Sequence, residues 1–126
     1  MLYDYTEMQF TDELLGKEVL PQHVERAEQG LYAFAKRLGV PQNDVIRGYL
    51  ADELVQLYTY RFVCFDKAYA LPGAYTMDGS TDDFYSKKLL YLDERIKILE
   101  KQITPEDLTG DAKKYARYRT VEIYRG

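Results

Sequence analysis

An apolar stripe between residues 81 and 103 constrains the fold of this 126-residue chain more than any other feature. Its six members step by four, three, four, three and four positions: Tyr85, Leu89, Leu92, Ile96, Leu99 and Ile103. Such steps place side chains on one face of an α-helix. Ser80 or Thr81 can cap the start of this helix. The pattern predicts a helix over residues 81–103 with one apolar face, called the inner stripe below, and a charged opposite face.

A helix is also predicted over residues 21–38, because its ends and its apolar spacing both fit. Pro21 suits the first turn, and Gly39 suits the position just after the end. Five apolar residues share one face: Val24, Ala27, Leu31, Phe34 and Leu38. Gly30, in the middle of this helix, marks a point where a neighbouring helix could approach closely.

The remaining long helix is predicted over about residues 43–70. Pro41 breaks the chain before it, and Asn43 or Asp44 would cap it. The Leu-Pro-Gly sequence at residues 71–73 ends it. Apolar residues occupy most of its circumference, which is typical of a helix packed on several neighbours. We therefore expect it to be the central helix of the fold.

The two ends of the chain show strand-like patterns. Residues 118–124 alternate and are rich in Tyr, Thr, Val and Ile, which predicts one β-strand. Residues 2–5 are a candidate for a second short strand, and residues 11–20 for a short helix. The backbone of a terminal strand needs partners. Three arrangements stay open: pairing with the N-terminal segment, exposure to solvent, or addition to a neighbouring subunit.

Together these patterns predict a mainly α fold, a small bundle of three main helices with a short C-terminal β-strand. The length allows one core, so we expect a helical domain over residues 1–110 and a tail over residues 111–126. The tail has five basic and two acidic residues, a balance of +3, and the whole chain has a net charge of −4, which leaves −7 on the rest. An acidic body and a basic tail favour head-to-tail contacts between identical subunits.

No group of residues forms a recognisable catalytic, metal or cofactor site. Cys64 lies among Phe and Val residues, which indicates a core thiol. His23 lies in the first turn of a helix, where a cation is disfavoured, and it is expected at the surface. Carboxylates adjacent in sequence, such as Asp52 and Glu53, point about 100° apart on a helix, so they should be separate charges rather than an acid–base pair. We expect a non-enzymatic protein with no metal or cofactor, and an enzymatic role stays the least favoured alternative.

Thirteen tyrosines without a tryptophan allow two interpretations: they border a thin core, or they form a protein interface. Those in the tail lie among basic residues, and this segment supplies the candidate interaction residues. They are Tyr115, Arg117, Tyr118, Arg119, Val121, Ile123, Tyr124 and Arg125. Such a mixture can also contact phosphates and stack on bases, although the net negative charge argues against nucleic acid as the main partner.

Three stretches near the C-terminus carry a family resemblance: Tyr85, Lys88-Leu89, Tyr91, Ile96 and Leu99; residues 102–110 (QITPEDLTG); and residues 121–126 (VEIYRG). They resemble the last long helix, the exit turn and the strand-like end of small virion proteins from tailed phages and prophages. The order of helices followed by an extended tail is similar to that of head–tail connector (adaptor) proteins. The resemblance implies assembly as a ring between the portal and the tail, with loops and termini clasping neighbouring subunits.

The leading hypothesis is therefore a structural or adaptor protein that forms a homo-oligomer, such as a ring, and docks to other virion proteins. No apolar run approaches 18 residues, and no signal peptide follows Met1, so we expect no membrane partner. The expected location is the cytoplasm, or the virion if the chain is of phage origin. The alternative is a small helical regulatory or nucleic-acid-binding module that uses the basic, aromatic tail.

Overall fold

The computed structural model describes residues 2–12, 15–69 and 79–110 of the chain. It contains the helices α1 (Pro21–Arg37), α2 (Tyr49–Tyr69), α4 (Gly79–Gln102) and α5 (Pro105–Thr109), and the 3-10 turns η1 (Tyr5–Glu7), η2 (Gly16–Glu18) and η3 (Gln42–Asp44). Within these ranges no residue is in a β-strand. The predicted mainly α class with three main helices is confirmed, whereas the predicted strand at 118–124 lies outside the described residues.

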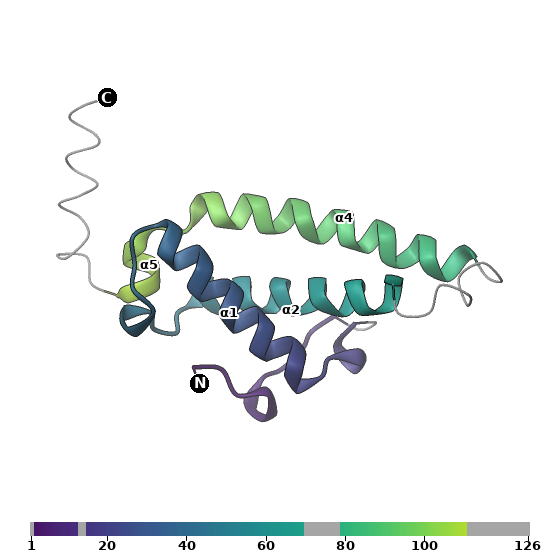
Figure 1. Ribbon diagram of the computed structural model, residues 1–126, viewed down its shortest axis with the longest axis horizontal. Coiled ribbons are helices and arrows are strands. Elements are labelled where there is room, and N and C mark those ends of the chain that lie inside the picture. Colours follow the sequence, from purple (N-terminus) through teal and green to yellow (C-terminus); the bar gives the residue numbers. More distant parts are fainter. Residues whose placement is uncertain (1, 13–14, 70–78, 111–126) are drawn as a thin grey trace.

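Helix α2 occupies the centre of the arrangement, as its apolar circumference predicts. Both α1 and α4 pack against it, and α5 contacts it as well. Figure 1 shows α4 running antiparallel to α2 along one side, while α1 crosses α2 obliquely. Residues 2–7, called the N-terminal segment below, lie on the side of α2 away from α4 (Figure 1), whereas Asp12 reaches α4 and pairs with Lys88 at 2.9 Å. The molecule therefore has two separate outer sides, one formed by α4 and one by the N-terminal segment with the start of α1.

The inner stripe of α4 faces the core, as predicted. Leu92, Ile96, Leu99 and Ile103 are buried, and Tyr85 and Leu89 pack against the same cluster while partly exposed. After α4 the chain turns into α5, whose start is capped by Asp107: its carboxylate accepts hydrogen bonds from the backbone N–H and the hydroxyl of Thr104 at 2.8 and 3.0 Å. Such a cap satisfies amide groups that the first turn leaves free.

The predicted start of the central helix, at residue 43 or 44, is wrong by about five residues. The chain makes the turn η3, then has no regular secondary structure over residues 45–48 before α2 begins at Tyr49. The cause is a tertiary contact, because the Ile46 N–H donates to the carbonyl of Leu108 at 2.8 Å. A Cβ added to Gly48 would lie 3.3 Å from the Asp107 carbonyl oxygen. This segment is held against α5, a contact that helical periodicity cannot reveal.

The strand predicted at residues 2–5 is also wrong. The backbone amides of Leu2 and Tyr3 donate to the side chain of Glu28 on α1 rather than to another strand. Asp4 then caps η1 by accepting from the Thr6 N–H at 3.0 Å. In the described part of residues 11–20, the predicted short helix is reduced to the turn η2. A side chain on α1 has therefore replaced the strand partner that these amides would need.

Gly30 marks a close helix–helix contact, as predicted. A Cβ added to it would lie 3.2 Å from Cδ2 of Tyr58 on α2. We expect Gly30→Leu to lower the free energy of unfolding by about 1–3 kcal/mol, because the larger side chain must displace this ring. Ala33→Leu, on the exposed side of the same helix, is the matched control and should change it by less than about 0.5 kcal/mol. Equal effects in urea denaturation would contradict the close contact.

Candidate interaction surface

A buried carboxylate fixes the N-terminal segment to α1. Glu28 is 2% exposed. Its two oxygens accept hydrogen bonds from the N–H of Tyr3 at 2.7 Å, the N–H of Leu2 at 3.2 Å and the hydroxyl of Tyr32 at 2.8 Å. We call this arrangement the N-terminal clasp. A buried carboxylate is tolerated when donors satisfy it, so the clasp accounts for an acidic residue on the buried face of α1.

Three tyrosines at the border of the core donate hydrogen bonds from their hydroxyls to carboxylates. Tyr3 donates to Asp52 at 2.7 Å, and Tyr58 donates to Glu100 at 2.5 Å, so each links two segments of the chain. Tyr32 donates to Glu28 within α1. Burial, reinforced by the acceptor carboxylate, raises the pKa of all three, that of Tyr32 to about 12. For these residues the first interpretation of the tyrosine content, bordering a thin core, is confirmed.

His23 is buried, not at the surface as predicted, with 2% of the residue exposed. Its Nδ1 accepts the N–H of Leu20 at 2.9 Å, and its Nε2 lies 2.6 Å from a carboxylate oxygen of Asp66 on α2. Because a backbone N–H can only donate, the ring proton must lie on Nε2 and point to Asp66. Nδ1 therefore closes the first turn of α1, and Nε2 joins the start of α1 to α2. The prediction failed because the cross-helix partner lies 43 residues away.

The other candidates for chemistry are located as predicted. Cys64 is fully buried, and burial raises the pKa of its thiol to about 11, which keeps it protonated near neutral pH. Asp52 pairs with Arg47 at 3.4 Å, whereas Glu53 pairs with Arg95 on α4, also at 3.4 Å. These adjacent carboxylates therefore diverge. Among the described residues, no group of three or more His, Cys, Asp or Glu side chains could hold a metal ion.

The outward side of α4 is less polar than predicted. Four large apolar residues are exposed there, and we call them the outer patch: Phe84, Leu90, Tyr91 and Ile98. Leu90 is 68% exposed, and Tyr91 and Ile98 are each 54% exposed. Phe84, Tyr91 and Ile98 are spaced by seven residues, so they form a line along the helix. This spacing is visible in the sequence, but the stronger inner stripe obscured it.

Positive charge surrounds the outer patch. Among residues 84–102 of α4, Lys87, Lys97 and Lys101 are exposed, with Glu94 as an exposed acidic residue between them. Arg95 is exposed as well but pairs with Glu53 of α2 at 3.4 Å. The other two acidic residues in this part of α4 pair with cations of neighbouring helices: Asp93 with Arg61 of α2 at 3.6 Å, and Glu100 with Arg37 of α1 at 3.3 Å. The outward side of α4 is thus apolar with a basic border, although the chain as a whole is acidic.

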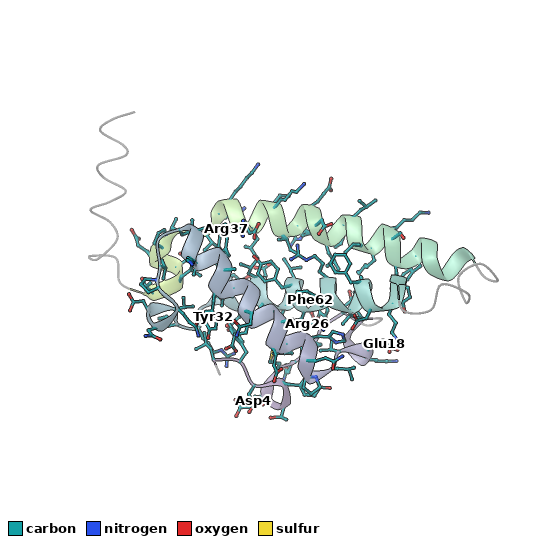
Figure 2. The ribbon with its side chains drawn as sticks, viewed as in Figure 1. Asp4, Glu18, Arg26, Tyr32, Arg37 and Phe62 are labelled. Carbon is teal, nitrogen blue, oxygen red and sulfur yellow. The ribbon has the colours of Figure 1, made fainter. Side chains whose placement is uncertain are left out.

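A second surface feature lies where the N-terminal segment meets α1. It is a shallow hollow of about 390 Å³, called the acidic hollow below, lined by Tyr3, Asp4, Tyr5, Thr6, Pro21, Val24 and Glu25. Both carboxylates are exposed. Hydrogen bonds from the Thr6 hydroxyl and N–H lower the pKa of Asp4, so its negative charge is retained at neutral pH. Figure 2 shows Asp4 on the side of the molecule away from α4.

The interaction residues predicted from the sequence all belong to the segment 111–126, which lies outside the described residues. The surfaces that the structure does describe, the outer patch and the acidic hollow, were not among the predicted sites. No protein-family model, curated protein or solved structure matches the chain at a significant level. None of the helices in the described part of the chain has the length and apolar character needed to cross a membrane.

Proposed function

We propose that this protein is a non-enzymatic adaptor that acts by docking to copies of itself and to other proteins. The outer patch is the observation that carries the proposal. Large apolar side chains that cluster on one exposed helix, with charged residues at their border, are typical of protein interaction sites. A soluble monomer gains no stability from exposing them. They are explained if another protein surface covers them.

In its finer form, the proposal is a head–tail connector of a tailed phage or prophage that assembles through its termini. It is supported by the resemblance of residues 85–110 and 121–126 to such proteins, and by the basic tail on an acidic body. The protein would then occur in the cytoplasm during assembly and in the virion afterwards. Sedimentation or light scattering over a wide concentration range tests the general proposal, alone and with candidate virion partners. A strict monomer that binds no partner would contradict it.

Deletion of residues 111–126 tests the role of the tail. We expect the truncated protein to self-associate at least about tenfold more weakly, because the tail supplies a charge of opposite sign to the body. Sedimentation equilibrium measures this change, and a circular dichroism spectrum checks that the helices are retained. Unchanged self-association would exclude the tail from assembly.

The nucleic-acid alternative predicts a different outcome for the same deletion. The full-length protein would bind oligonucleotides at low salt, and the truncated protein would not, while self-association stayed the same. An absence of oligonucleotide binding by the full-length protein at low salt would remove this alternative.

A further inference from the structure

We infer that the outer patch of one copy docks on the acidic hollow of the next copy, so that identical subunits associate head to tail. This inference rests on the proposed self-association and specifies which surfaces meet. Helix α4, which carries the outer patch, and residues 3–6, which line the acidic hollow, lie on opposite sides of α2 (Figure 1), so a subunit cannot close the two surfaces on itself. Each copy can therefore bind one neighbour through α4 and another through its N-terminal side, which is a heterologous contact.

Charge complementarity identifies the occupant of the outer patch. The cations that border it, Lys97 and Lys101 among them, need a surface with exposed carboxylates. The acidic hollow offers Asp4 and Glu25, both exposed. A second copy of the chain therefore supplies the negative charge that complements the lysines at the border of the outer patch, and no other partner is required.

The apolar parts of the two surfaces match as well. The hollow has exposed apolar lining from Pro21, and the neighbouring residue Leu20 is 49% exposed. Leu90 and Tyr91 protrude from the facing surface of the other copy. Burying these side chains would remove apolar area from water on both partners, while the charges fix the relative orientation.

The arrangement predicts that charge reversals on the two surfaces compensate each other. The patch variant is Lys97→Glu with Lys101→Glu, and the hollow variant is Asp4→Asn with Glu25→Lys, in which asparagine can still cap η1. Each variant alone should self-associate at least about tenfold more weakly than the wild type, because like charges then face each other. Mixed in equal amounts, they should associate within about threefold of the wild type, since every contact again joins opposite charges.

Sedimentation velocity on the full-length chain, at low and high salt, measures these associations. Lys17→Glu is the matched control, because it reverses an exposed charge outside both surfaces, and it should leave association unchanged. A mixture that associates no better than its components would overturn the inference. The inference would also be overturned if the hollow variant by itself associated like the wild type, since the outer patch would then dock on a surface other than the hollow.

The results also separate this inference from the proposal on which it rests. A wild-type protein that associates but is indifferent to both charge variants overturns the docking arrangement and leaves the adaptor function standing. A wild-type protein that stays monomeric at every concentration and binds no virion partner overturns both.

Discussion

Replacing Leu92 with alanine should lower the free energy of unfolding by about 3 kcal/mol, whereas replacing Leu90 should change it by less than about 0.5 kcal/mol. The two leucines are separated by one residue on the same helix. Leu92 is 2% exposed and belongs to the core cluster, while Leu90 is 68% exposed. Removal of the Leu92 side chain loses buried apolar contact and leaves a cavity between α4 and α2. Urea denaturation followed by circular dichroism measures both changes.

This pair also separates stability from docking. Leu90→Ala should weaken self-association because it reduces the apolar area of the outer patch, while the stability of the fold stays nearly the same. Leu92→Ala should lower the stability of the fold. Any loss of self-association in this variant would then reflect unfolding rather than a direct effect on docking. If both variants lost the same stability, the orientation of α4 described above would be wrong.

Replacing Glu28 with alanine should cost about 3 kcal/mol of stability, because three donors lose their acceptor at once. Two of these donors are backbone amides, those of Leu2 and Tyr3, which no change of side chain can remove. We expect the N-terminal segment to detach from α1 in this variant. Hydrogen exchange should then show faster exchange of the Tyr3 amide, while the amides in the middle of α2 stay protected.

Two conservative variants serve as controls for the clasp. Glu28→Gln keeps one acceptor oxygen but turns an amide group toward the donors. Its free energy of unfolding should therefore lie between that of the wild type and that of Glu28→Ala. Tyr32→Phe removes one donor and leaves both backbone bonds, and it should cost about 1 kcal/mol. Unchanged exchange of the Tyr3 amide in Glu28→Ala would contradict the clasp.

The acidic hollow depends on the clasp, which links the fold to the proposed docking. Tyr3, Asp4 and Tyr5 line the hollow from one side, and their backbone is fixed through Glu28. A variant that frees the N-terminal segment therefore removes one wall of the hollow. We expect Glu28→Ala to weaken self-association as well, under conditions in which the helices remain folded.

Helix positions and their buried faces could be predicted because each depends on residues within a few turns. The steps of three and four from Leu89 to Ile103 determine which side of α4 is apolar. Pro21 and Gly39 determine where α1 can begin and end. The thiol of Cys64 was predicted to be buried because its neighbours in sequence are apolar. None of these predictions required knowledge of the rest of the chain.

The candidate site was harder to predict, because a second line of apolar residues on a helix can be either buried against a neighbour or exposed. The sequence pattern is the same in both cases. Phe84, Tyr91 and Ile98 fit the helical period as well as residues of the inner stripe do. The six-residue inner stripe predicted the buried side of α4 correctly, but only the folded chain shows that these three residues on the other side stay exposed. The acidic hollow combines Asp4 with Glu25, which are 21 positions apart and belong to different elements. The predicted tail residues remain a prediction.

By itself, the sequence determined the mainly α class, the three main helices and their buried faces, because hydrophobic periodicity is a local property. Tertiary structure decided where α2 starts, where His23 lies and how the N-terminal amides are satisfied. In each case a polar group is paired with a group far away in sequence: Ile46 with Leu108, His23 with Asp66, and Tyr3 with Glu28. A buried hydrogen bond depends on the position of both partners, and only the folded chain brings them together.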